Sequence, residues 1–274
     1  MLKALKYYGG KLSQLDYILP MIPPHVCYVE PYGGSAAVLL NKDKSEVEVY
    51  NDLDSAVVIF FRVLREKPKE LINYLNLLPY SREEFEYAKQ VVSGFSNSDI
   101  EKAAYYYLLS EGSISCNKAQ WSYGRNRNRV STYFNSIDNL MPSVERIRDC
   151  IIEHKEAADV IQRYDSEDTF FYIDPPYMQS ERSDKRYKID YTELEHLELL
   201  MLLAKVKGMV LLSGYDNGLY RKRLKKWHKK QYTMYCKAVG HTRSNNIMGE
   251  GVLENHKRIE TLWYNYDEPE RSLF

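Results

Sequence analysis

The sequence predicts an α/β fold, in which helices cover both faces of a mostly parallel sheet. Short apolar runs alternate with helical patterns, and such alternation is typical of parallel sheets with helical connections. The run Phe170–Ile173 holds only large apolar and aromatic residues, which indicates a strand buried on both faces. From about Lys67 to Glu145 the strand pattern stops and helical patterns take over. We therefore expect one α/β domain from residues 1–66 and 146–274, and an inserted, mainly helical lobe from residues 67–145.

Each predicted strand is a short apolar run bounded by polar or turn-forming residues. The strands are His25–Val29, Val47–Tyr50, Cys150–Ile152, Phe170–Ile173, Met209–Ser213, Tyr232–Cys236 and Ile259–Tyr264. Helices are predicted between them at Ala36–Leu40, Ser55–Glu66, Ala157–Tyr164, Thr192–Lys207 and Asn217–Lys226, and in the lobe at Arg82–Val92 and Asp99–Leu109. Glu195 stands three residues after Thr192, a spacing that indicates a capping box at the start of that helix.

Composition excludes several classes of protein. Lys plus Arg and Asp plus Glu both total 38 in 274 residues, so any surface for a polyanion must come from local clustering. The four cysteines form no C-x-x-C pair, which argues against a zinc ribbon or a disulfide scaffold, and we expect no metal. The sequence has neither a secretion signal nor a long apolar span, so we expect a cytoplasmic protein without a membrane partner.

The most informative motif, Asp174-Pro175-Pro176-Tyr177, follows the buried run. Neither proline can continue a strand ladder or enter a helix interior, so the chain must leave the sheet at Asp174. Ligands of open α/β sheets bind at the carboxyl ends of the strands. A neutral exocyclic amine donates two hydrogens, which the Asp174 carboxylate and the Pro175 carbonyl can accept while the Tyr177 ring stacks on the ring bearing the amine. The motif therefore predicts a site for a planar amine.

A second motif, Glu30-Pro31-Tyr32-Gly33-Gly34-Ser35, follows the first predicted strand. Its glycines allow a tight turn and close approach of a ligand to the backbone. The pattern matches neither G-x-G-x-x-G nor a phosphate loop, which disfavours a nucleoside triphosphate. Asp52 ends the next strand. Its distance along the sequence from the glycine loop is close to the roughly 20 residues at which a carboxylate binds ribose hydroxyls. Together with the acidic Glu30, these residues suggest a ligand with adenosine and a positive centre, and S-adenosyl-L-methionine fits that description.

Three segments in this order resemble the Dam-like family (D12 class, group alpha) of DNA adenine-N6 methyltransferases. They are Lys6-Tyr7-Tyr8-Gly9-Gly10-Lys11, the loop Tyr28–Ser35 and the segment Asp174–Tyr177. Relatives also have similar pieces at Tyr191-Thr192, Glu195-His196, Leu212–Tyr215 and Glu260–Asn265. The resemblance covers nearly everything outside the lobe. It implies a Rossmann-like S-adenosylmethionine-dependent methyltransferase fold with a seven-stranded sheet.

The resemblance also implies a role for each motif. Tyr7 and Lys11 would border the cofactor, and Asp52 would hold its ribose. The main cofactor loop would be formed by Glu30, Pro31, Tyr32, Gly33, Gly34 and Ser35. Asp174 would touch both the cofactor side and the target amine, with Pro175, Pro176 and Tyr177 completing the catalytic motif. The α/β domain would be catalytic, and residues 67–145 would recognise the DNA target.

The expected chemistry is methyl transfer to a weak nucleophile. The lone pair of adenine N6 is delocalised into the ring, and Asp174 with the Pro175 carbonyl would localise it as charge develops. In a duplex the amine is stacked and paired, so the adenine must be rotated out at a cost of roughly a few kcal/mol. We therefore expect a site-specific enzyme that methylates adenine N6 in double-stranded DNA after base flipping.

The candidate DNA contacts are aromatic and basic residues outside these motifs: Trp121, Arg125, Arg127, Arg129, Lys185, Arg186, Lys188 and Arg243. The arginines of the lobe alternate with asparagines, a mixture that can contact phosphates and base edges. The lysines and the arginine at 185–188 follow the Asp174 motif, where a segment can close over a flipped base, and a loop exposed without function is the alternative. The recognition sequence does not carry over, because the family pattern N-x-x-G-x-F-N-V-P is absent from the lobe.

The densest basic cluster, Arg221–Lys230, has a more ordinary interpretation. Tyr220, Leu224 and Trp227 lie at helical spacing, so the basic residues are expected to form the solvated face of a helix. His241–Asn246 is expected at the tip of a hairpin that joins the last two strands.

Three alternatives stay open at this point. N4-cytosine methylation uses the same amine geometry, although related pockets more often begin with Ser than with Asp. Methylation of RNA or of a protein amine is a second alternative. The third is a non-catalytic DNA-binding partner whose cofactor site survives as structure. A cognate restriction endonuclease is a partner to test, and no obligate protein partner is implied.

Overall fold

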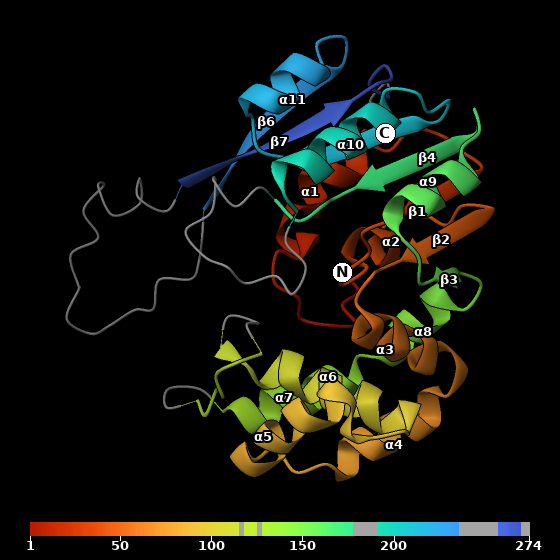
Figure 1. Cartoon of the computed structure of the whole chain (residues 1–274). Helices are drawn as coiled ribbons and strands as arrows, with labels where there is room; N and C mark the ends of the chain where they lie inside the picture. The colour runs from red at the N-terminus through yellow and green to blue at the C-terminus, as the bar shows by residue number, and fades with distance from the viewer. Residues whose placement is uncertain (115–117, 125–127, 178–190, 236–256, 270–274) are drawn as a thin grey trace.

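The computed structural model describes residues 1–114, 118–124, 128–177, 191–235 and 257–269. These residues form a seven-stranded sheet with helices on both faces and a group of helices at one end (Figure 1). The α/β class predicted from the alternating pattern is confirmed. No helix in the described ranges is long and apolar enough to cross a membrane.

Each predicted strand overlaps an observed strand. The strands are β1 (Cys27–Glu30), β2 (Val47–Asn51), β3 (Ile151–Glu153), β4 (Thr169–Ile173), β5 (Met209–Gly214), β6 (His228–Tyr235) and β7 (Lys257–Tyr264). Their order across the sheet is β3-β2-β1-β4-β5-β7-β6. Only β7 runs antiparallel to its neighbours, β5 and β6. The strand order reverses between β1 and β4, which is where ligands bind in sheets of this kind.

Alternate residues of β4 pack on opposite faces of the sheet. Phe170 and Tyr172 belong to one buried cluster, and Phe171 and Ile173 belong to the other. The second cluster is covered by α9 (Ala157–Tyr164), α10 (Glu193–Leu203) and α11 (Gly218–Arg223), whereas α1 (Leu15–Ile18), α2 (Ala37–Asn41) and α3 (Ser55–Glu66) cover the first. All five residues of β4 are buried, as its unbroken apolar run predicted.

Side-chain caps fix where two helices begin beside the sheet. Thr192 and Glu195 form the predicted capping box at the start of α10. Asp54 caps α3 by accepting a hydrogen bond from the amide of Ala56. Each cap satisfies amide groups that have no partner within the helix.

The region between β2 and β3 beyond α3 is helical in its described residues. It contains α4 (Pro68–Leu77), α5 (Arg82–Gln90), the π-helical turn Val91–Phe95, α6 (Asp99–Gly112), α7 (Arg129–Asp138) and α8 (Met141–Ile147). Most of these helices gather below the sheet in the view of Figure 1. The ring of Tyr107 in α6 stacks on Phe60 in α3 with centroids 5.8 Å apart, and both rings belong to the buried cluster that contains Phe170. The lobe therefore packs on the sheet layer through a continuous core, and the boundary at residue 67 stays a prediction.

The amino-terminal segment is tied to the lobe by charge. The Glu111 carboxylate, near the end of α6, lies 3.0 Å from Lys3 Nζ and 2.7 Å from Lys6 Nζ. The Glu111 side chain is only 2% exposed, so these two ammonium groups neutralise a carboxylate that is nearly removed from water.

Two predicted helices are too long. The helix expected over Thr192–Lys207 ends at Leu203 as α10. The helix expected over Asn217–Lys226 ends at Arg223 as α11, and β6 begins at His228. Tyr220 and Leu224 are buried as predicted, whereas residues 228–235 pair with β7 along their whole length. The basic residues from His228 onward therefore lie in an edge strand, where lysines are common because they discourage pairing with another chain. The expected hairpin tip His241–Asn246 lies outside the described residues.

A buried ion-pair network joins α8 to β2. The Glu48 carboxylate accepts hydrogen bonds from the Arg146 guanidinium and from Lys42 Nζ, the latter at 2.6 Å, and none of the three side chains is more than 9% exposed. Burial acts to raise the pKa of Glu48, but the hydrogen bonds from Arg146 and Lys42 outweigh it, so the pKa is lowered. Its contribution to stability is therefore present above the unfolded pKa and is lost as the pH falls through the folded pKa.

Arg146→Met should lower the free energy of unfolding by about 3 kcal/mol, because it leaves a buried carboxylate with only Lys42 as its cationic partner. Denaturant titration measures the loss. Arg62→Met is the matched control, since Arg62 pairs with Asp99 at 2.6 Å but the two side chains are 43% and 47% exposed. The control should lower the free energy of unfolding by less than about 1 kcal/mol. Equal losses in the two variants would contradict a special contribution of the buried pair.

Candidate active site

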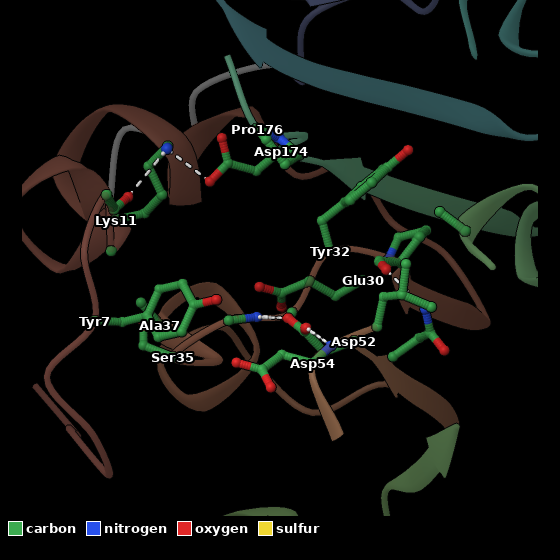
Figure 2. A pocket seen from close by; sticks show the side chains of 18 of the residues that line it. Tyr7, Lys11, Glu30, Tyr32, Ser35, Ala37, Asp52, Asp54, Asp174 and Pro176 are labelled. Carbon is green, nitrogen blue, oxygen red and sulfur yellow. Dashed lines mark hydrogen bonds and ion pairs between the residues drawn. The ribbon is translucent and has the colours of Figure 1, made fainter. Parts of the chain in front are cut away.

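A pocket opens at the carboxyl ends of β1, β2 and β4, where the strand order reverses (Figure 2). Its empty volume is about 860 Å³ including the mouth, which suits a ligand of nucleoside size. The lining includes residues from all three motifs found in the sequence: Tyr7 and Lys11, the loop Glu30–Ser35, and Asp174 with Pro176. Segments distant in the sequence thus meet at one site.

The glycine loop is shaped by a tyrosine from the neighbouring strand. Gly33 donates its amide hydrogen to the Asn51 carbonyl at 2.7 Å, and the Tyr50 hydroxyl donates to the Gly34 carbonyl at 2.8 Å. A Cβ atom on Gly33 would lie 2.1 Å from the Tyr50 ring, so only glycine fits there. Gly34 has φ +48°, and its added Cβ would lie 3.0 Å from the Tyr7 ring. The two glycines are therefore required for different reasons. Gly33 leaves room for the Tyr50 ring, and Gly34 adopts a left-handed backbone conformation.

Asp52 follows β2 and binds the glycine loop. Its carboxylate accepts hydrogen bonds from the amides of Gly34 at 2.7 Å and Asp54 at 2.8 Å. Burial raises the pKa of Asp52, while those two hydrogen bonds act in the opposite direction. Each carboxylate oxygen has more than one lone pair, so Asp52 can hold the loop and also accept hydrogen bonds from a ligand hydroxyl.

Glu30 ends β1 and is almost completely buried beside the same pocket, with 3% exposure. One of its carboxylate oxygens accepts hydrogen bonds from the Tyr28 hydroxyl at 3.0 Å and the Leu39 amide at 3.1 Å. Burial raises the pKa of Glu30 to about 8. The side chain is therefore mainly neutral at pH 7, and a cation in the pocket would favour its ionised form.

Asp174, the first residue after β4, forms an ion pair with Lys11. Lys11 Nζ lies 2.6 Å from the Asp174 carboxylate, and the two side chains are 6% and 17% exposed (Figure 2). Lys11 is positioned by the 3₁₀ turn Lys11–Gln14, which precedes α1. The nearby ammonium stabilises the charged form of Asp174, which acts only as a hydrogen-bond acceptor when ionised.

Tyr177, three residues after Asp174, does not line the pocket itself but contacts Lys11, which does. Lys11 Nζ lies 5.0 Å from the centroid of its ring, and Tyr215 packs edge-on with centroids 4.7 Å apart. The Tyr177 hydroxyl donates a hydrogen bond to Glu260 at 2.9 Å. Of the two prolines in the motif, Pro175 is buried and Pro176 lines the pocket. The four-residue motif therefore presents a carboxylate to the pocket and an aromatic ring beside it.

Several residues that line the pocket were given no role from the sequence. Tyr8, Gly9, Gly10 and Tyr191 belong to segments that carry the family resemblance, and the others are Ala37, Asn51, Leu53, Asp54, Lys155 and Ala157. The Asn51 side chain donates hydrogen bonds to the carbonyls of Pro31 at 2.8 Å and Lys155 at 3.0 Å, so it joins the loops after β1 and β3. Tyr191 accepts a hydrogen bond from the Tyr32 hydroxyl at 3.1 Å. Asn51 and Lys155 lie at or just after the carboxyl ends of strands. Because ligands of such sheets bind at those ends, their position in the sequence could have indicated them.

The predicted DNA contacts are only partly within the described residues. Arg129 begins α7, and Trp121 packs against Tyr80 and Phe85 with ring centroids 4.3 and 5.3 Å apart. The Trp121 ring thus helps to build the lobe, and its contact with DNA stays a prediction. The remaining candidates, Arg125, Arg127, Lys185, Arg186, Lys188 and Arg243, lie outside the described residues.

The fold and the pocket together define a class of enzyme. A seven-stranded sheet with an antiparallel β7, a glycine loop after β1 and a carboxylate after β2 are consistent with the fold of S-adenosylmethionine-dependent methyltransferases. Among the described residues, the lining contains the carboxylates Glu30, Asp52, Asp54 and Asp174 and the lysines Lys11 and Lys155. This donor set fits a ligand with ribose hydroxyls and a cationic centre.

Residues 7–236 match the model of a family described as D12 class N6 adenine-specific DNA methyltransferase, and the chain belongs to this family. Its members transfer a methyl group from S-adenosylmethionine to adenine in DNA. The predicted family, fold and cofactor are confirmed by this match.

Curated relatives carry names that agree with the family. Modification methylase StsI of Streptococcus sanguinis is 24% identical over 72% of this chain, and the chain spans only 32% of that relative. The type II methyltransferase M.CviBI of Paramecium bursaria Chlorella virus NC1A is 24% identical, with 76% of this chain and 80% of the relative covered. A DNA adenine methylase of Salmonella typhi is 25% identical, with coverage of 87% and 90%.

Glu30→Gln should flatten the dependence of stability on pH. The folded pKa of about 8 lies above the ordinary glutamate pKa of 4.5, so between these values the folded protein binds a proton that the unfolded chain has lost. The free energy of unfolding of the wild type should therefore fall as the pH rises from 5.5 to 8. Denaturant titrations at both pH values compare wild type with the variant. Identical pH dependence in the two proteins would contradict the raised pKa.

Proposed function

We propose that this chain methylates N6 of an adenine rotated out of double-stranded DNA, at the pocket bordered by Asp174. The observation that carries the proposal is the meeting of Asp174, the Glu30–Ser35 loop and Asp52 around one cavity. A target amine beside Asp174 would then lie next to a cofactor held by the loop. The relative StsI is much longer than this chain, so the activity of the whole protein is part of the proposal.

The residues that would hold the cofactor surround the cavity on several sides. Asp52 would accept hydrogen bonds from the ribose hydroxyls, and the glycine loop would allow close approach of the backbone. Tyr7 and Lys11 border the opposite wall in Figure 2. Glu30 would complement a positive charge, because ionisation of its carboxyl becomes favourable beside a cation. When bound, S-adenosylmethionine supplies an electrophilic methyl group on a sulfonium.

Asp174 and the Pro175 carbonyl would accept the two hydrogens of the target amine. Drawing both hydrogens toward fixed acceptors localises the nitrogen lone pair as positive charge develops on the nitrogen. Lys11, 2.6 Å away, would balance the charge of the Asp174 carboxylate and hold it in place. Tyr177 would provide the aromatic surface on which the base stacks.

A covalent route through cysteine has no support in the described residues. Neither Cys27 nor Cys150 lines the pocket, and burial raises the pKa of both thiols. Attack at cytosine C5 requires a thiolate nucleophile beside the base. Direct transfer to an exocyclic amine requires none, which agrees with the arrangement at Asp174.

We also propose that the inserted lobe, residues 67–145, contacts the DNA target. Arg129 begins α7, next to the arginine-rich segment that the sequence indicated, and the neighbouring Tyr123 is 67% exposed. An exposed aromatic ring beside basic residues can contact bases and phosphates together. Since two relatives are named as a modification methylase and a type II methyltransferase, a restriction endonuclease with the same recognition sequence is the protein partner we propose to test.

Asp174→Asn should lower kcat at least about 100-fold, because the amide removes a charged acceptor where positive charge develops. Transfer of a radiolabelled methyl group to duplex DNA measures the rate, and nucleoside analysis of the product distinguishes N6-methyladenine from N4-methylcytosine. Thermal unfolding checks that the variant folds.

Asp216→Asn is the matched control for this substitution. Asp216 follows β5 as Asp174 follows β4, and it pairs with Lys229 at 3.0 Å, but it does not line the pocket. The control should retain wild-type kcat. A fully active Asp174→Asn variant, or a product methylated on cytosine, would contradict the proposed function.

Arg129→Ala should weaken DNA binding and reduce the slope of log Kd against log salt concentration by about one, as expected for one lost phosphate contact. Fluorescence anisotropy with a labelled duplex at several salt concentrations measures both quantities. Arg163→Ala, at an exposed arginine of α9, serves as the control and should change neither. An unchanged salt slope in Arg129→Ala would count against this contact.

A further inference from the structure

Glu260 is a buried carboxylate at a position that its strand would otherwise fill with an apolar residue. In β7, Glu260, Leu262 and Tyr264 share one face because alternate residues of a strand point the same way. Leu262 and Tyr264 belong to the buried cluster of that face, and Glu260 itself is only 7% exposed. A carboxylate placed there loses hydration, a cost that specific polar partners must offset.

Tyr177 is the hydrogen-bond partner that the structure gives this carboxylate. The Tyr177 hydroxyl donates to Glu260 Oε2 at 2.9 Å. Burial raises the pKa of Glu260, while the positive charge of Lys11 and the hydrogen bond from Tyr177 act in the opposite direction. Lys11 in turn pairs with Asp174. Glu260 is therefore hydrogen-bonded to Tyr177 and is influenced electrostatically by Lys11, the partner of Asp174.

The hydrogen bond restricts the ring at the atom farthest from the backbone. A tyrosine ring is placed by two side-chain torsions, and a fixed hydroxyl at its tip limits both of them. The edge-on contact with Tyr215 and the ammonium of Lys11 act on the ring, whereas the hydrogen bond to Glu260 acts on the hydroxyl. Loss of the carboxylate would therefore remove the restraint at the tip of the ring, while the ion pair of Asp174 with Lys11 stays in place.

We propose that Glu260 is a positioning residue for methyl transfer, which holds the Tyr177 ring in the plane on which the target base stacks. This inference rests on the proposed function, because it assigns Tyr177 to the base and not to the cofactor. On this proposal Glu260 acts as a hydrogen-bond acceptor for the Tyr177 hydroxyl, and its effect on the rate requires that hydroxyl. If Glu260 acted instead by attracting Lys11, its effect would require its negative charge.

Four variants separate these roles: Glu260→Leu, Glu260→Gln, Tyr177→Phe and the double variant Glu260→Leu with Tyr177→Phe. Glu260→Leu should lower kcat about tenfold, equivalent to about 1.4 kcal/mol, with the Kd for S-adenosylmethionine unchanged. Glu260→Gln keeps an acceptor oxygen and should stay within about twofold of the wild type, as expected if the acceptor and not the charge matters. Tyr177→Phe should be slowed to a similar degree as Glu260→Leu.

The double variant gives the decisive comparison. If Glu260 acts through the Tyr177 hydroxyl, the double variant should be no slower than Tyr177→Phe alone, because the same interaction is removed twice. A further tenfold loss in the double variant would overturn the inference, and so would wild-type activity of Tyr177→Phe. A Glu260→Gln variant as slow as Glu260→Leu would assign the role to charge and would also overturn it.

The controls come from the same strand. Tyr264 in β7 donates a hydrogen bond to Glu268 at 2.7 Å, so Tyr264→Phe and Glu268→Gln disrupt a tyrosine–carboxylate pair outside the pocket and should retain wild-type kcat. If Glu260→Leu fails to unfold cooperatively, the kcat values of Glu260→Gln and Tyr177→Phe still test the proposal. A slow Tyr177→Phe beside a nearly wild-type Glu260→Gln would support the acceptor role. A wild-type protein without methyl transfer would refute the proposed function, whereas an active wild type with additive variants would refute this inference alone.

Discussion

The parallel pairing of β1 with β4 is the constraint on which the rest of the site depends. Their register aligns Cys27 with Thr169 and Val29 with Phe171, so the two strands end within one residue of the same level. Glu30 and Asp174 consequently border one cavity although they are far apart in the sequence. The glycine loop, the carboxylate after β2 and the proline motif could not face a common ligand if this pair were broken.

Carboxyl groups in reduced contact with water give the cavity its chemical character. Each one has different surroundings. Burial raises the pKa of Glu30, two backbone amides donate hydrogen bonds to Asp52, and Asp174 pairs with the Lys11 ammonium. One fold can therefore offer a neutral acid, a hydroxyl acceptor and an ion-paired carboxylate within a single cavity. This division agrees with a family whose cofactor is a cation and whose substrate is a neutral amine.

Much of the fold was predictable because local patterns and tertiary packing agree. The apolar run before Asp174, the capping box at Thr192 and the glycines after Glu30 each specify one conformation on physical grounds. The helix predicted after Asn217 was too long because the basic run Arg221–Lys230 continues without a break in the sequence, although its first residues end α11 and those from His228 onward pair with β7. The contact between Tyr177 and Glu260 joins residues in separate strands, which no local pattern could indicate.

The anchoring of the amino-terminal segment on Glu111 has a mechanical consequence. Lys3 and Lys6 bind the end of α6, and a few residues later the same segment provides Tyr7 and Lys11 to the cavity wall. A rotation of α6 would pull on that wall or break two ion pairs shielded from solvent. Because one short segment joins α6 to the cavity wall, the position of the helical lobe and the positions of Tyr7 and Lys11 are mechanically coupled.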